Sequence, residues 1–88
     1  MSTSQEKHVG VIALTVENRQ EHAAAVNAVI SDFGELVVGR MGVPYRERGM
    51  SVISLLVDGT AEALDSLRAK LAAIPGVQVS TLLLTPEA

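Results

Sequence analysis

The sequence predicts an α+β domain whose elements follow the order strand, helix, strand, strand, helix, strand. Two stretches carry apolar residues at the three- and four-residue spacing of a helix, and a glycine closes each of them, at Gly34 and Gly76. Short runs rich in Val, Ile and Leu flank these stretches, at residues 8–17, 35–41, 50–57 and 77–84. Each half is therefore a split βαβ unit. Two such units interlock into a four-stranded antiparallel sheet with both helices on one face, which is the ferredoxin-like fold.

The first strand is predicted at residues 8–17, with a helix after Asn18. The segment HVGVIALTVE is short, β-branched and apolar on both of its alternating faces. Asn18, with Glu21 three residues later, is close to a capping box, which predicts that the Asn18 side chain caps the helix. Apolar side chains follow at helical spacing, at Ala23, Val26, Ile30 and Phe33. Gly34 is expected to end this helix in the left-handed conformation.

The second and third strands are predicted at residues 35–41 and 50–57, with the sequences ELVVGRM and MSVISLLV. Residues 42–49 (GVPYRERG) are interpreted as a connection, because glycines bound the segment and Pro44 stiffens it. The Asp58-Gly59 pair predicts a turn after the third strand.

The second helix is predicted to begin at Thr60, a residue type that caps helices well. It carries an apolar stripe made of Leu64, Leu67, Leu71 and Ile74. Pro75-Gly76 ends it, and VQVSTLLL at residues 77–84 is the last strand. A single domain is therefore expected over residues 8–84, with polar tails at residues 1–7 and 85–88.

Length and composition restrict the class of protein. The chain has 88 residues and no cysteine, so it offers neither disulfides nor thiolate metal ligands. A net charge of −3 and a pI near 5.2 argue against a nucleic-acid-binding protein. No apolar run approaches the ~20 residues that span a bilayer, and the polar start lacks the apolar core of a secretory signal. We expect a cytoplasmic protein that binds no membrane and no nucleic acid directly.

Both faces of the predicted sheet are apolar. The first strand places Gly10, Ile12, Leu14 and Val16 on one side and Val9, Val11 and Ala13 on the other. Two helices cover only one face, so the other keeps enough aliphatic surface to mark an interaction site. We expect a homo-oligomer, a dimer or a tetramer, that assembles through the sheet face or a strand edge. Cover by the tails or by long side chains is the alternative.

The sequence shows no recognisable catalytic or metal-binding motif. His8 and His22 belong to no such motif and are expected at the surface. Glu17 and Asp58 fall at strand ends, where turn and capping roles explain them. We therefore predict no catalytic residue, no metal site and no cofactor. A metal site shared between subunits is the alternative.

One polar cluster stands out, because three of the seven basic residues fall within nine positions. It contains Arg40, Tyr45, Arg46 and Arg48, which are the predicted ligand-binding residues. Arginine binds carboxylate or phosphate through two parallel hydrogen bonds, and tyrosine can stack or hydrogen-bond beside it. The cluster therefore predicts a small anionic ligand or an anionic partner. A solvated loop in which Glu47 pairs with an arginine is the alternative.

Two segments carry a resemblance to a known family: GRMGVPYRERGMSVISLLVDGT at residues 39–60 and the LxxxLxxIPGVxV run at residues 67–79. From about Val9 to Leu84 the chain resembles the small ACT-like regulators associated with the iron-only hydrogenase system. The resemblance implies an ACT-type ferredoxin-like fold, a homo-oligomer and a regulatory role.

That family is itself similar to the nickel-sensing C-terminal domain of nickel-responsive repressors. This chain has neither that sensor's cysteine nor its histidine set, so the resemblance carries no metal site over. Only seven polar residues precede the first strand, so we expect no ribbon-helix-helix DNA-binding segment. ACT domains that bind amino acids commonly have a glycine in the loop after the first strand, and residues 17–19 contain none.

Three functions remain open from the sequence. The first is a regulator of the iron-only hydrogenase system, a homo-oligomeric small-ligand-sensing domain without its own DNA-binding segment, and not an enzyme. The second is a protein-interaction module that docks a larger partner through the Arg40–Arg48 loop. The third is a small dimeric enzyme with a ferredoxin-like fold, which would need a deep pocket lined by a histidine or a buried carboxylate.

Overall fold

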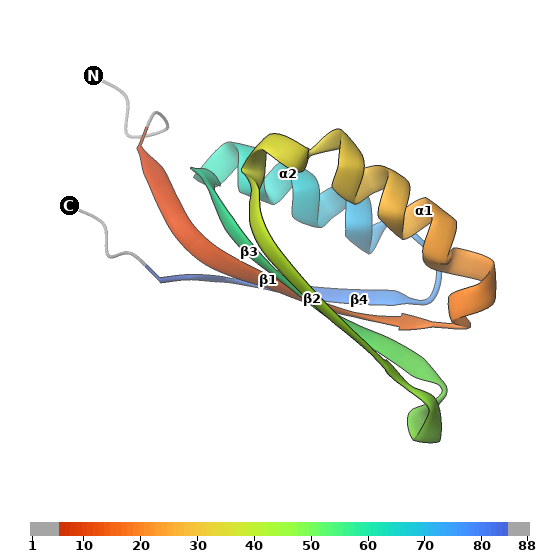
Figure 1. Ribbon diagram of the computed structural model, residues 1–88. Helices are drawn as coiled ribbons and strands as arrows, with labels where there is room; N and C mark the ends of the chain where they lie inside the picture. Colours follow the sequence, from red (N-terminus) through yellow and green to blue (C-terminus); the bar gives the residue numbers. More distant parts are fainter. Residues whose placement is uncertain (1–5, 85–88) are drawn as a thin grey trace.

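The computed structural model describes residues 6–84 (at Arg19, the backbone only), and its elements follow the predicted order (Figure 1). The strands and helices are β1 (Lys7–Glu17), α1 (Arg19–Asp32), β2 (Val37–Tyr45), β3 (Met50–Thr60), α2 (Ala61–Ala72) and β4 (Val77–Leu83). A 3-10 turn, η2 (Gly34–Leu36), precedes β2, and a second, η3 (Arg46–Arg48), joins β2 to β3. The predicted tail at residues 85–88 and most of that at residues 1–7 lie outside the described residues; Lys7 belongs to β1.

The sheet has the strand order β2-β3-β1-β4, and every pair of neighbours is antiparallel. The two central strands, β1 and β3, pair along 11 residues, from Lys7 opposite Thr60 to Glu17 opposite Met50. Both helices lie on the same face of this sheet (Figure 1). The predicted α+β, ferredoxin-like fold is confirmed.

The core lies between the sheet and the two helices, and it is aliphatic. Alternate residues of the central strands are buried there, namely Ile12, Leu14 and Val16 of β1 and Ile53, Leu55 and Val57 of β3. The helices contribute Val26 and Ile30 from α1 and Leu64, Leu67 and Leu71 from α2. Each such side chain stabilises the fold by about 1.5–3 kcal/mol relative to full exposure. The predicted stripe of the second helix is confirmed, with Ile74 partly buried at its end.

The two helices begin in different ways. At α2 the prediction is confirmed, because the Thr60 side chain accepts a hydrogen bond from the backbone N–H of Ala63, with an N–O distance of 3.1 Å. At α1 the predicted capping box is wrong. Asn18 adopts φ 50° and ψ 58°, and its side chain makes no capping hydrogen bond. Asparagine tolerates this left-handed conformation better than most residues, so it serves the turn through its backbone.

Two predicted glycine roles are also wrong. Helix α1 ends at Asp32 with Phe33 as its C-cap, and Gly34 begins η2 without a positive φ, so Gly34 is not a left-handed helix end. Asp58 and Gly59 form no turn, because both pair with β1 inside β3. Packing at Gly59 is tight instead: a Cβ added there would lie 2.8 Å from Cδ2 of Leu36, so the Leu36 side chain would have to shift.

The β2–β3 hairpin is longer than predicted. Residues 42–45 were expected in a connection, but they continue β2 as far as the pair Tyr45–Met50. The turn consists of η3 and Gly49, whose φ of 65° suits glycine. An 11-residue strand such as β3 is about 36 Å long, whereas the 14-residue helix α1 is about 21 Å long. The hairpin therefore extends past α1, which leaves part of its inner side uncovered (Figure 1).

Candidate functional site

The face of the sheet opposite the helices is exposed and apolar. Its exposed large side chains include Met41 (67%), Leu82 (62%), Val43 (52%), Tyr45 (42%), Leu56 (41%) and Val52 (38%). This confirms the expectation that the side without helices keeps several aliphatic residues. We call this surface the open face.

Strand register places these side chains, Tyr45 excepted, in three adjoining rows. The rows are Leu82–Val11–Leu56, Ser80–Ala13–Ser54–Met41 and Gln78–Thr15–Val52–Val43. None of these residues is charged, and those at the centre are small. The middle of the open face is therefore uncharged, with aliphatic side chains around small ones.

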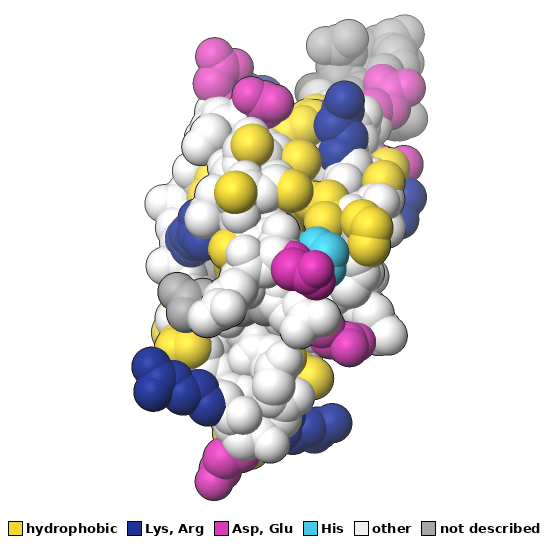
Figure 2. All heavy atoms as spheres, turned by 90° about the vertical axis from the view of Figure 1, so that its right-hand side faces the viewer, with side chains coloured by type: hydrophobic (Ala, Val, Ile, Leu, Met, Phe, Trp, Pro, Cys, Tyr) yellow, Lys and Arg dark blue, Asp and Glu magenta, His cyan; other side chains and the backbone are white. Residues whose placement is uncertain are grey.

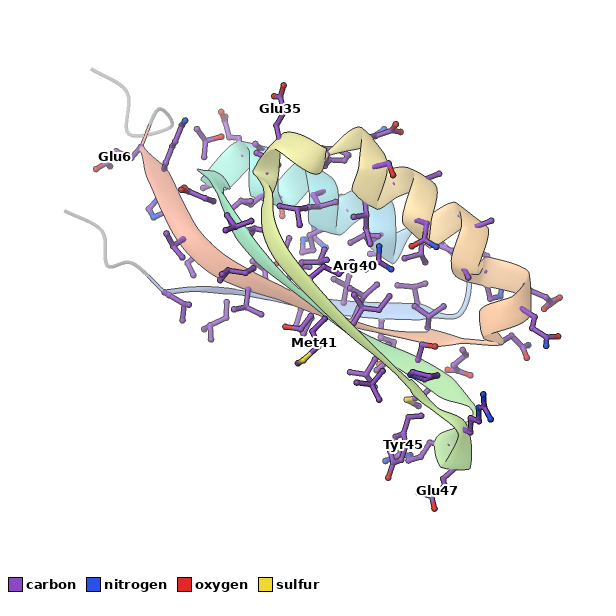
Figure 3. All side chains as sticks on the ribbon, in the orientation of Figure 1. Glu6, Glu35, Arg40, Met41, Tyr45 and Glu47 are labelled. Carbon is purple, nitrogen blue, oxygen red and sulfur yellow. The ribbon has the colours of Figure 1, made fainter. Side chains whose placement is uncertain are left out.

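A β-bulge decides on which side of the sheet Arg40 lies. Strand β2 pairs Val37 with Val57 and Gly39 with Leu56, so residue 38 is extra. Because side chains alternate between faces, one extra residue reverses the side of every residue that follows. Arg40 consequently lies on the helix side of β2, and Met41 lies on the open face (Figure 3).

The four predicted ligand-binding residues are not brought together. Tyr45 is 42% exposed and lies away from Arg40, on the other side of β2 (Figure 3). Arg46 and Arg48 belong to η3 at the tip of the hairpin. Figure 2 shows basic side chains on both sides of this lower end of the molecule. Ligand binding by these residues stays a prediction, and only Arg40 and Arg46 line the cleft described next.

The cleft lies between α1 and the β2–β3 hairpin. At its inner end, Nη2 of Arg40 donates a hydrogen bond to Oδ1 of Asn27 on α1, with an N–O distance of 2.8 Å. This inner part has a volume of about 90 Å³, and its apolar wall consists of Val16, Ala23, Val26 and Ile53. Two outer parts of about 380 Å³ each continue along the hairpin past Pro44, one of them as far as Arg46.

Ser51 lines all three parts of this cleft. It is only 7% exposed, and its Oγ has no hydrogen-bond partner among the described residues. Neither Ser51 nor Asn27 was predicted from the sequence. A signal for Ser51 was available, because it is the one hydroxyl residue among the buried positions Ser51, Ile53, Leu55 and Val57 of β3.

The surface position predicted for the histidines is wrong for His8. Its side chain lies opposite Gly59 and is 6% exposed, and Nδ1 finds no hydrogen-bond partner within residues 6–84. His22 is half-buried beside Gly76. The described part of the chain holds no group of three or more His, Asp or Glu side chains that could bind a metal. Neither helix in that part combines the length and the hydropathy of a membrane span.

Comparison with known proteins decides the family. Residues 8–81 match the family described as "TM1266-like: Iron-only hydrogenase system regulator, putative". The chain belongs to the TM1266-like family. Its structure is similar to that of the uncharacterized protein TM1266 from Thermotoga maritima, with a TM-score of 0.87 and 32% identity over 91% of this chain and 100% of that one. The resemblance found in the sequence is confirmed. No curated protein matches the chain.

More distant structures share the fold of this TM1266-like chain. The ACT domain from GTP pyrophosphokinase of Chlorobium tepidum has a TM-score of 0.74 at 20% identity, over 88% of this chain and 100% of that domain. SnoaB, a cofactor-independent oxygenase from Streptomyces nogalater, has a TM-score of 0.58 at 12% identity, over 94% of this chain and 96% of that one. Likeness at these identities shows the fold alone, which is ACT-like.

Proposed function

We propose that the TM1266-like chain is a homo-oligomeric regulator of the iron-only hydrogenase system that senses a small ligand. The observation that carries the proposal is the open face, where three adjoining rows of side chains hold no charge and several exposed aliphatic groups. Burial of apolar surface is favourable by about 25 cal/mol per Å². The family description supports the regulatory part of the proposal.

A second copy of the chain is the occupant that fits the open face. Ala13, Ser54 and Ser80 at its centre are small, so another sheet can approach closely. Two sheets pack face to face at about 10 Å, and a two-fold axis brings the same patch of both copies together. Such an assembly would bury Leu56 and Val52 of each copy.

The cleft supports ligand sensing, because one strand carries both surfaces. Ser51 lines the cleft and Val52 lies on the open face, and the two are consecutive residues of β3. A ligand that binds one assembly state more tightly shifts the population toward that state. A ligand in the cleft would therefore change assembly through the position of β3.

The test is the molar mass measured by size-exclusion chromatography with light scattering at micromolar concentration. We expect a dimer or a tetramer. Leu56→Glu places a carboxylate on the open face and should yield a monomer, because burying an unpaired charge is costly. Ala25→Glu, on an exposed position of α1, is the matched control and should keep the wild-type mass. A monomeric wild type, or an assembly that tolerates Leu56→Glu, contradicts the proposal.

A protein-interaction module is the second candidate, and the hairpin tip favours it. Arg46 and Arg48 lie in η3, at the end of the hairpin that extends past α1 (Figure 1). There they would pair with acidic groups of a larger partner. A thermal-shift panel of metabolites, amino acids and divalent metals separates the two candidates, because a bound ligand raises the melting temperature by mass action. If no compound of the panel raises the melting temperature, the interaction module is favoured.

A further inference from the structure

The cleft between α1 and the hairpin has the electrostatic character of an anion site. The charged residues that line its three parts are Arg40 at the inner end and Arg46 at the outer end. No Asp or Glu is among the described residues that line it. In a chain with a net charge of −3, positive charge without a neighbouring carboxylate favours an anionic ligand.

Arg40 has hydrogen-bond capacity left for such a ligand. A guanidinium has five N–H donors in a planar fork, and here one of them bonds to Oδ1 of Asn27 at 2.8 Å. This bond holds the side chain at the inner end of the cleft and orients the Asn27 amide. The Arg40 fork matches two oxygens of one carboxylate or phosphate, and the NH2 group of Asn27 is a further donor.

Ser51 is a second and independent sign of a ligand. Its hydroxyl is buried on a strand face whose other buried side chains are aliphatic, and within residues 6–84 it has no hydrogen-bond partner. A buried hydroxyl without a partner lowers stability, so native proteins rarely keep one without a use for it. Ser51 is among the residues that line the inner and both outer parts of the cleft. Because Arg40 lines the same inner part, an anion bound there is the acceptor that we assign to this hydroxyl.

The sizes of the parts indicate how a ligand would lie. The inner part, of about 90 Å³, is far smaller than the ~300–1,000 Å³ of pockets that enclose whole ligands. The inner part therefore has room for one small head group of a ligand, such as a carboxylate or a phosphate. The outer parts, of about 380 Å³ each, run along the hairpin toward Arg46 and have room for the rest of a small molecule.

We infer that the cleft binds a small metabolite through a carboxylate or phosphate group, which Arg40, Ser51 and Asn27 hold at the inner end. The body of the metabolite lies in the outer cleft, toward Arg46. This inference rests on the ligand-sensing role proposed above and gives that ligand a chemical class and a site.

The experiment is an NMR titration of the ¹⁵N-labelled full chain with sodium phosphate and, separately, with sodium succinate. Sodium chloride at matched ionic strength is the blank. We expect saturable shifts at the Ser51 backbone amide, the Asn27 side-chain amide and the Arg40 Nε–H signal. The tighter of the two probes identifies the head group as phosphate or carboxylate.

Three variants locate the binding. Arg40→Ala should weaken binding about tenfold or more, because hydrogen bonds to a charged group are the strong ones. Ser51→Ala should weaken it about three- to tenfold. Arg48→Ala removes the same charge as Arg40→Ala but at the hairpin tip, so it should change binding less than about twofold. Far-UV circular dichroism and the melting temperature verify that each variant folds.

Shifts no larger than those with sodium chloride overturn the inference, and so does an equal loss in Arg40→Ala and Arg48→Ala, which would mean general charge attraction. Light scattering keeps the two proposals apart. A monomer with Arg40-dependent binding contradicts the oligomeric regulator and supports the cleft. An oligomer without Arg40-dependent binding of either probe supports the oligomeric regulator and contradicts the cleft inference.

Discussion

The two faces of β3 have similar hydrophobicity and opposite environments. Ile53, Leu55 and Val57 lie under the helices and are 7%, 0% and 0% exposed. Val52 and Leu56, between them in the chain, are 38% and 41% exposed on the open face. Among these five residues, solvent exposure differs between the two faces of the strand, whereas hydrophobicity does not. The covered face therefore explains why the chain folds, and the open face is where we propose that a second copy binds.

The largest expected difference between the faces is that between Leu55→Ala and Leu56→Ala. Leu55→Ala leaves a cavity in the core and should lower the free energy of unfolding by about 2–5 kcal/mol. Leu56→Ala removes a half-exposed side chain and should lower it by less than about 1 kcal/mol per chain at low protein concentration. Guanidinium unfolding followed by circular dichroism measures both. Equal losses would mean that the open face is as well packed as the core.

The secondary structure was predictable because apolar periodicity follows from which side chains the core needs. Leu64, Leu67 and Leu71 show this on α2, and the Thr60 cap was predictable from its side chain alone. The turn predicted at Asp58-Gly59 was wrong because a glycine can serve a chain in two ways. A turn needs its conformational freedom, whereas β3 needs its missing side chain to make room for Leu36. Local sequence does not distinguish these uses, since Leu36 is 23 positions away along the chain.

The candidate site was less predictable, because it depends on the register between strands. The sequence placed Arg40 and Tyr45 in one polar cluster, and the structure places them on opposite sides of β2. The bulge at residue 38 determines which side each takes. Gly39 in the segment VVGR is compatible with a bulge, but a glycine alone does not show which residue is extra. Asn27 meets Arg40 only because the folded chain brings these residues of α1 and β2 together. Contacts of this kind become visible only in the folded chain.

Two glycines allow an intermediate comparison of the faces. Gly59→Ala puts a Cβ 2.8 Å from Cδ2 of Leu36 and 3.4 Å from Cδ2 of Leu64, under the helices. We expect it to lower the free energy of unfolding by about 1–3 kcal/mol. At Gly39 the nearest atom to an added Cβ is Cβ of Leu56, at 3.9 Å, so Gly39→Ala should change stability by less than about 1 kcal/mol. Thermal unfolding measures both, and a Gly39→Ala loss as large as that of Gly59→Ala would contradict the contrast.

Ser51 is the polar exception on the covered face of β3, and its substitution should have the smallest effect. Its hydroxyl has no hydrogen-bond partner in the described part of the chain, so Ser51→Ala breaks no internal hydrogen bond. In buffer without phosphate or carboxylate we expect the free energy of unfolding not to fall and to rise by less than about 1 kcal/mol, because the variant removes a buried hydroxyl that has no partner. Leu55→Ala, on the same face of the same strand, is the reference for a residue that serves the core. A Ser51→Ala loss above about 1 kcal/mol would mean that the hydroxyl supports the fold. Weaker phosphate or succinate binding without a loss of stability would mean instead that the serine serves the cleft.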